Sequence, residues 1–248
     1  MKKQNITKNF YKVFEDAYIY FNKHLFNSQL PDCLITMQRK ANTMGYFSAN
    51  RWSDEYGITT HEIALNPTFF ATRPLIEVFQ TIVHEQCHLW QFEFGKQKDS
   101  LKTYHNQEWS EKMQSVGLMP SSTGKPGGKQ TGQKMADFPI ENDKFYNACI
   151  NLLNTGFKLG LVDRHAEPIA EPFNIIPHND EEAIFILNTA VKDIYKNINL
   201  IDSDNLKRIR QTKQKITYQC KQCDIKVWGK PNINIVCGDC SVGFVYGK

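Results

Sequence analysis

The sequence predicts an α+β fold, in which helices pack on a small β-sheet around one largely buried helix, and a small β module follows at the C-terminal end. Apolar residues recur at helical spacing in residues 6–26 and 75–94. Residues 34–40 and 62–67 instead have the short, β-branched character of strands. Four of the seven cysteines lie after residue 219. A chain of 248 residues can therefore hold one sizeable apolar core and a small module whose stability does not come from such a core.

The composition is that of a folded protein without a membrane segment. Hydrophobic residues make up 41% of the chain and charged residues 23%, which excludes a disordered or fibrous protein. No run approaches the ~18 apolar residues that cross a bilayer, and the N-terminal segment lacks the apolar stretch of a signal peptide. We therefore expect a cytoplasmic protein that could associate with the nucleoid. In that compartment an odd number of cysteines favours metal binding over disulfides.

The first third of the chain divides into a helix and two strands. The helix at 6–26 is amphipathic and should end at Asn27. The segment between the two strands, GYFSANRWSDEYG at 45–57, is rich in turn-forming residues and predicts an irregular connection. The strand at 62–67 is expected at an edge of the sheet, where a substrate peptide could add by backbone pairing. His61, next to it, is expected at the surface.

The helix at 75–94 should be largely buried. Thr72 can cap it, Pro74 fits its first turn, where a missing N–H costs nothing, and Gly95 can end it. The later segments are predicted as a helix at 103–116, a mobile loop at 120–134, a helix or strand at 145–157, a loop at 158–180, an exposed helix at 181–200 and a linker at 201–215.

The helix at 75–94 contains His84-Glu85-Gln86-Cys87-His88, which matches H-E-x-x-H. Histidines four residues apart on a helix lie ~6 Å apart along its axis and point the same way, so both can reach one zinc ion. Glu85 lies ~100° around the helix from His84, close enough to take a proton from a zinc-bound water without binding the metal. The alternative is two ordinary, partly buried histidines, which the helical context disfavours.

A mononuclear catalytic zinc needs a third protein ligand. The metzincin continuation H-x-x-G-x-x-H is excluded, because Gln91 and Phe94 stand at its glycine and histidine positions. His105, in the sequence Tyr-His-Asn-Gln-Glu-Trp, is the better candidate, and Glu108 is the second choice.

The glycine-rich segment at 120–134 does not match a phosphate-binding loop. Three residues separate Gly124 from Gly128, where the motif requires four, and Gln130 stands where Ser or Thr would bind magnesium. We expect either a flexible basic flap beside the active site or a solvated loop.

Cys220-x-x-Cys223, thirteen residues and Cys237-x-x-Cys240 have the spacing of four thiolates around one zinc ion. Because no position remains for water, the site would be structural, in a β zinc ribbon too small to fold on apolar burial alone. The alternative is that either CxxC pair is a redox-active dithiol, but the sequence around the cysteines is not thioredoxin-like. The expected cofactors are therefore two zinc ions, one catalytic and one structural.

These residues resemble the SprT-like zinc metallopeptidases, a family that includes the Spartan-related proteases of DNA–protein crosslinks. The resemblance covers residues 25–35, 45–47, 62–67 and 81–88, and His105 with Trp109. The family pattern after the catalytic helix is usually His-Gly-x-x-Trp or Phe, whereas here Asn106 replaces the glycine. The resemblance implies that His84, His88 and His105 bind the catalytic zinc and that Glu85 is the catalytic residue.

The cysteine-rich end, with VWGKP at 227–231, is similar to the zinc ribbon of bacterial SprT-like proteins. We therefore expect three parts: a SprT-like metallopeptidase domain at 1–157, a helical and linker region at 158–215, and a zinc ribbon at 216–248.

Basic residues gather between positions 201 and 230, where eight Lys or Arg and three Asp give a local net charge of +5 beside Tyr218 and Trp228. Cations gain from counterion release along phosphates, and an exposed ring stacks on an unpaired base. DNA, single-stranded or duplex, is therefore an expected partner. The predicted contacts are Lys207, Arg208, Arg210, Lys213, Lys215, Trp228 and Lys230. The alternative is a solvated linker with Trp228 in the core of the ribbon.

The sequence thus predicts a zinc metalloendopeptidase whose substrates are proteins associated with DNA. One alternative is a zinc-ribbon nucleic-acid-binding or regulatory protein with an inactive peptidase-like domain. Another is a general peptidase or toxin unrelated to DNA. Glu85 favours an enzyme, because a structural zinc site has no need of a carboxylate beside its ligands.

Overall fold

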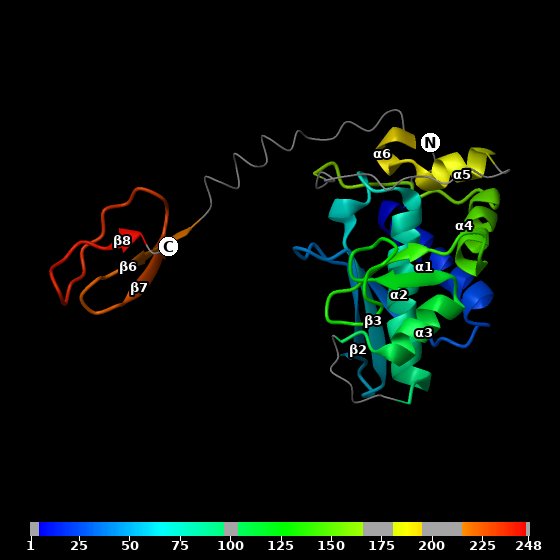
Figure 1. Ribbon diagram of the computed structural model, residues 1–248, viewed down its shortest axis with the longest axis horizontal. Coiled ribbons are helices and arrows are strands. Elements are labelled where there is room, and N and C mark those ends of the chain that lie inside the picture. Colours follow the sequence, from blue (N-terminus) through cyan, green and yellow to red (C-terminus); the bar gives the residue numbers. More distant parts are fainter. Residues whose placement is uncertain (1–4, 97–103, 166–180, 195–214, 247–248) are drawn as a thin grey trace. The chain divides into compact units, whose positions relative to one another are not determined.

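The computed structural model describes residues 5–96, 104–165, 181–194 and 215–246 (Figure 1). Contacts between residues divide the chain into two compact units, Met1–Asn199 and Leu200–Lys248. No helix in the described part of the chain is long and apolar enough to span a membrane. The predicted three-part division at residues 157 and 215 stays a prediction.

The first unit combines helices with two small sheets. Its helices are α1 (Ile6–Leu25), η1 (Pro67–Phe69, a 3₁₀ turn), α2 (Leu75–Phe94), α3 (Gln107–Ser115), α4 (Lys144–Asn154), α5 (Glu181–Asn188) and α6 (Val191–Ile194). Its strands are β1 (Cys33–Met37), β2 (Gly45–Ser53) and β3 (Thr59–Leu65) in one sheet, and β4 (Leu118–Ser121) and β5 (Ala136–Pro139) in a hairpin. The second unit holds β6 (Ile216–Gln219), β7 (Lys226–Gly229) and β8 (Val245–Tyr246). The prediction of a mixed α+β chain with small sheets is therefore confirmed.

Strand β3 is the centre of the main sheet. It pairs parallel with β1 and antiparallel with β2, in the order β1-β3-β2. The prediction that this strand lies at an edge is therefore wrong. Its last residues, Ile63, Ala64 and Leu65, are each about 1% exposed, and burial on both faces is typical of a central strand.

Residues 45–53 form strand β2, where the sequence predicts an irregular connection. Polar residues are tolerated because β2 is an edge strand whose second half is exposed. Its pairing shifts register between Ser48 and Trp52, and Asn50 there has a left-handed φ of 49°. The turn-forming residues therefore make a bulge within a strand.

Helix α2 runs through the core and is buried on most sides. Phe21 of α1 contacts both Phe79 of α2 and Phe145 of α4, with ring centroids 5.4 and 6.1 Å apart. The three helices thus share one apolar core, which holds α2 firmly against β2 and β3.

The ends of α2 agree with the sequence, but its cap does not. Pro74 occupies the N-cap position in an extended conformation and offers no side-chain hydrogen bond. Thr72 lies too far upstream, and its hydroxyl donates to the carbonyl of Phe69 instead. Gly95 ends the helix as predicted, and its N–H donates to the carbonyl of Gln91 at 2.9 Å.

The later elements also depart from their predictions in places. The helix expected at 103–116 starts at Gln107, and the segment at 145–157 is helical up to Asn154. The helix expected at 181–200 is α5 followed by α6 up to residue 194. It is not exposed as predicted, because α5 buries Ala183, Ile184 and Leu187 in the core.

Candidate metal centre

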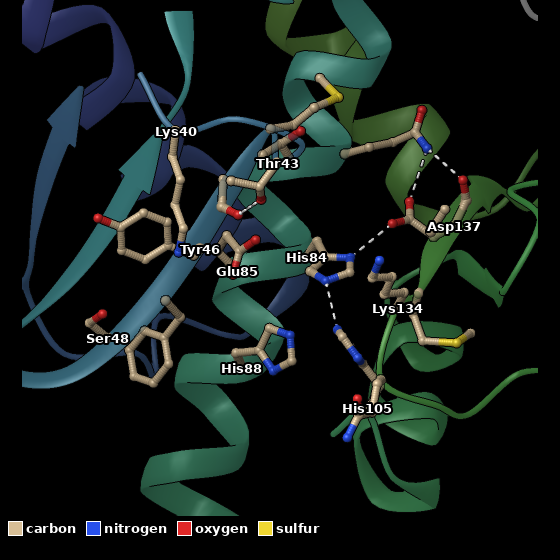
Figure 2. A pocket seen from close by; sticks show the side chains of 18 of the residues that line it. Lys40, Thr43, Tyr46, Ser48, His84, Glu85, His88, His105, Lys134 and Asp137 are labelled. Carbon is tan, nitrogen blue, oxygen red and sulfur yellow. Dashed lines mark hydrogen bonds and ion pairs between the residues drawn. The ribbon is translucent and has the colours of Figure 1, made fainter. Parts of the chain in front are cut away.

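Three histidines meet beside the middle of α2 (Figure 2). His84 and His88 lie one helical turn apart on α2, with ring centroids separated by 5.1 Å. His105, just before α3, places its ring 5.3 Å from that of His84 and 4.8 Å from that of His88. One nitrogen of each ring lies within 4.8 Å of the others. The structure therefore brings together the three residues that the sequence predicts as zinc ligands.

Glu108, the second choice for a third ligand, lies elsewhere. Its Oε1 accepts a hydrogen bond from the backbone N–H of Lys96 at 2.8 Å. Among the described residues, His105 is the one that completes the group with His84 and His88.

A carboxylate orients His84 from the side opposite the cluster. Nδ1 of His84 lies 3.0 Å from Oδ2 of Asp137, a residue of β5. Gln80, one turn before His84, donates from its amide to Oδ1 of the same carboxylate at 2.9 Å. A proton held on Nδ1 leaves the lone pair of Nε2 free for a metal, as is usual for metal-binding histidines. Sequence reasoning missed Asp137, because no spacing connects it with the motif.

The glycine-rich segment holds His105. The backbones of His105 and Gly132 exchange two hydrogen bonds of 2.9 and 3.0 Å. The ring nitrogen Nδ1 of His105 also lies 3.0 Å from the carbonyl of Gly132. Gly132 has a φ of 153°, which side-chain-bearing residues rarely adopt. The predicted flap at 120–134 thus spans the end of β4 and most of the β4–β5 connection, and it contacts His105 through Gly132.

Burial sets the protonation of the cluster. Burial and the charge of His84 lower the pKa values of His88 and His105, that of His105 to about 4. Burial also lowers the pKa of His84, but the hydrogen bond to Asp137 and the charges of Glu85 and Asp137 outweigh it, so that this pKa is raised. Two of the rings are therefore neutral at pH 7, as zinc ligands must be.

Glu85 faces the same cleft as the histidines without belonging to their cluster. The cleft encloses about 1010 Å³ and is lined by the histidines, by Glu85 and by much of β2. Glu85 is 6% exposed, and burial raises the pKa of its carboxyl to about 7. Three imidazoles with a carboxylate beside them fit a catalytic zinc site. Three protein ligands leave the fourth position of a tetrahedral zinc ion open for water.

Comparison with known proteins extends these observations. The model of the SprT-like family matches residues 14–127. A protein of Salmonella typhimurium, described as "Uncharacterized protein in mucB 3'region", is 45% identical over 58 residues, which cover 23% of this chain and 78% of that protein. The chain belongs to the SprT-like family. No solved structure matches it.

The SprT-like match contains His84, Glu85, His88 and His105 but ends before the residues that hold them. Gly132 and Asp137 both lie after residue 127. The support that Gly132 gives to His105 and that Asp137 of β5 gives to His84 therefore comes from outside the matched part of this SprT-like chain.

The second unit gathers the four cysteines that follow the SprT-like match. The sulfur atoms of Cys220, Cys223, Cys237 and Cys240 lie within 4.8 Å of one another. Such a group fits a closed tetrahedral zinc site with no position for water.

The two CxxC turns of this unit have the same backbone geometry. The carbonyl of Cys220 accepts from the N–H of Asp224 at 3.0 Å, and that of Cys237 accepts from Ser241 at 2.8 Å. Asp224 and Ser241 have left-handed φ values of 59° and 54°. Backbone N–H groups of Cys223 and Gln222 lower the pKa of the Cys220 thiol to about 7, whereas hydrogen bonds with the neighbouring thiols raise the pKa values of Cys223 and Cys240. A thiolate is therefore favoured at Cys220 in particular.

The predicted nucleic-acid contacts are only partly within the described residues. Lys207, Arg208, Arg210 and Lys213 lie outside them. Lys215 and Lys230 are exposed, and Trp228 is 67% exposed. The alternative that Trp228 forms the core of the ribbon is therefore wrong. Tyr218 fills that core instead, and its hydroxyl donates to the carbonyl of Lys230 at 2.6 Å.

His61 is buried, contrary to its predicted place at the surface. It is 8% exposed, its Nδ1 accepts from the backbone N–H of Asn50, and its Nε2 lies 3.0 Å from Oε1 of Glu93. The reason is the central position of β3, which places this residue beneath α2. The expectation that His61 is not a ligand of the histidine cluster agrees with these contacts.

Proposed function

We propose that this SprT-like protein is a zinc-dependent endopeptidase. One observation carries the proposal: three histidines at ligand spacing and a separate buried carboxylate, Glu85, open into one cleft. A zinc ion held by His84, His88 and His105 would activate a water and polarise a peptide carbonyl. Glu85 would accept the proton of that water and pass it to the leaving amine.

The free edge of β2 supports a peptide as the substrate. Residues 45–49 of β2 line the cleft next to Glu85, and β2 has no second strand partner among the described residues. An extended chain can add to such an edge through its backbone, whatever its side chains are. The strand proposed for substrate pairing is therefore β2 in place of β3.

The decisive experiment joins zinc content with proteolysis. Wild type should bind two zinc ions per chain, and His105→Ala and Cys237→Ala should each bind one, as measured by mass spectrometry. Glu85→Gln should keep both ions and the fold but cleave casein about 10²–10⁴-fold more slowly, because it lacks the general base. Glu15→Gln, an exposed change on α1, is the matched control.

The second candidate is a nucleic-acid-binding protein whose histidine zinc is structural. It predicts that Glu85→Gln changes neither zinc content nor any activity of the wild type. Cleavage by Glu85→Gln at the wild-type rate would therefore reject the peptidase proposal.

The exposed face of the ribbon supports substrates associated with DNA. Trp228 and Lys226 lie two residues apart on β7 and point to the same face of the sheet. Their partners on the neighbouring strand β6 are Thr217 and Gln219. An exposed indole that shares a strand face with a lysine is suited to stacking on an unpaired base while the lysine attracts the phosphate. We propose that the ribbon localises the peptidase to DNA.

A further inference from the structure

The charged side chains that line the active-site cleft differ in exposure according to their sign. Glu77, Glu85 and Asp137 are the carboxylates that line it within the described part of the chain, and the side chains of all three are buried. Glu77 pairs with Arg73 at 2.8 Å, and Asp137 is held by His84 and Gln80. None of these three acids therefore contributes an exposed negative charge to the cleft.

Among the described residues, the exposed charged side chains that line the cleft are all positive. Lys40, Arg51 and Lys134 line it and are exposed. None of the three forms an ion pair with a carboxylate of the described residues. A zinc ion would add two further positive charges. The described lining of the cleft therefore produces a positive potential, because no exposed carboxylate belongs to it.

The lysines stand on opposite walls. The Lys40 ammonium lies 4.6 Å from the ring centroid of Tyr46, next to the free edge of β2. Gly45 and Phe47 face α2, since Gly45 approaches Thr81 and the ring of Phe47 contacts Phe92. By alternation along the strand, Tyr46 faces the other way, so Lys40 lies on the outer side of β2. Lys134 belongs to the β4–β5 connection across the cleft (Figure 2).

A peptide paired with the edge of β2 would pass between these walls. Its side chains would alternate, one set toward the outer face near Lys40 and the next toward the β4–β5 connection near Lys134. In both places the lysine of the cleft would attract acidic side chains of the peptide and repel its Lys or Arg side chains.

We propose that the cleft selects acidic protein segments, with Asp or Glu side chains beside the scissile bond bound by Lys40 and Lys134. The proposal rests on the peptidase function proposed above and names its substrate class. A nucleic-acid backbone also carries negative charge, but it cannot form the β-pairing that the free edge of β2 offers. The structure therefore favours a peptide.

Cleavage rates of three matched peptides test the selection. The cleavage site is first mapped on a mixed-sequence peptide, and its flanking residues are then set to Glu, Gln or Lys. Wild type should cleave the Glu peptide roughly twofold to fivefold faster than the Gln peptide for each ion pair formed, and the Lys peptide slowest. The preference should shrink at 1 M salt, where the screening length is ~3 Å.

Charge reversal identifies the residues responsible. Lys134→Glu and Lys40→Glu should each turn the preference toward the Lys peptide, and Lys134→Gln should reduce it without reversal. Lys129→Glu is the matched control, because it makes the same change in the same connection but does not line the cleft. Equal rates for the three peptides in wild type, or an effect of Lys129→Glu as large as that of Lys134→Glu, would overturn the proposal.

A binding measurement separates this proposal from the peptidase function. Zinc-loaded Glu85→Gln is titrated with fluorescent Glu and Lys peptides, and anisotropy reports binding without cleavage. Tighter binding of the Glu peptide, lost in the double variant Glu85→Gln with Lys134→Glu, supports the selection even if no wild-type proteolysis is found. Equal binding of the two peptides contradicts it. Binding in the cleft of an oligonucleotide but of neither peptide, lost with Lys134→Glu, would assign these lysines to nucleic acid instead.

Discussion

Asn106 shows how a departure from the expected family pattern is accommodated. It follows His105 at the position where the SprT-like pattern usually has glycine. Its φ is −85°, which any residue adopts, so the freedom of glycine is not required. Its side chain accepts from the N–H of Trp109 at 3.0 Å and from the amide of Gln91 at 2.6 Å. Asparagine here therefore caps α3 and connects it to α2, which fixes His105 beside the other two histidines.

Asp137 gives a prediction at the same scale. Asp137→Asn should lower the zinc affinity of the histidine site about 10- to 100-fold, because the amide carries no negative charge to polarise the N–H of His84. Competition with a chromogenic chelator measures this affinity, with the zinc of the ribbon as an internal reference. Asp16→Asn, an exposed change on α1, is the control. An affinity within twofold of wild type would show that Asp137 has no part in holding the metal.

At the scale of elements, the close contact between β2 and α2 positions the edge strand proposed to pair with substrate beside Glu85. The contact depends on Gly45. A Cβ at this residue would lie 2.7 Å from Cγ2 of Thr81 and 2.9 Å from the carbonyl oxygen of Ala64. Both distances are shorter than non-bonded contacts of a real Cβ atom. The carbonyl oxygen of Ala64 belongs to the backbone, so it cannot move aside by a side-chain rotation. Glycine at position 45 therefore determines how closely the edge strand β2 approaches α2.

Gly45→Ala should accordingly destabilise the protein by about 1–3 kcal/mol, the usual cost of overpacking. It should also lower kcat/KM for peptides, because β2 must move away from Glu85. Urea unfolding measures the first effect and peptide cleavage the second. Ser48→Ala, on the same strand but facing the other way, should change stability by less than ~0.5 kcal/mol. Unfolding of Gly45→Ala at the wild-type urea midpoint would refute this account of the strand.

For the whole molecule, each unit has its own core and its own candidate metal site. The first unit is stabilised by apolar burial around α2. The second unit has three short strands and, among its described residues, buries Tyr218, Cys220 and Cys237. We therefore expect its folding to depend largely on a metal bound by the four cysteines. Removal of zinc by a chelator should therefore unfold the second unit more than the first unit.

The proposed division of labour predicts that DNA binding and catalysis can be separated. Trp228→Ala should weaken binding of single-stranded DNA by about 1–3 kcal/mol, the typical contribution of one stacked base, while peptide cleavage without DNA stays unchanged. Anisotropy of a labelled oligonucleotide measures the binding. Trp52→Ala, which removes an exposed indole from the first unit, is the control. If both variants bind DNA equally well, the ribbon does not use Trp228 for DNA.

The sequence by itself determined the features that depend on neighbouring residues. The helical repeat placed His84 and His88 on one face of α2, and each CxxC pair lies within one short turn. The apolar spacing likewise defined the ranges of α1 and α2, because helices depend on contacts three and four residues apart.

Tertiary structure alone decided what depends on residues far apart in the chain. His105 and Asp137 reach His84 across 21 and 53 positions. The central place of β3, the burial of His61 and the exposure of Trp228 follow from strand order and packing, which local periodicity does not encode. A side chain is buried or exposed according to what packs over it, and that surface is created only when distant segments meet.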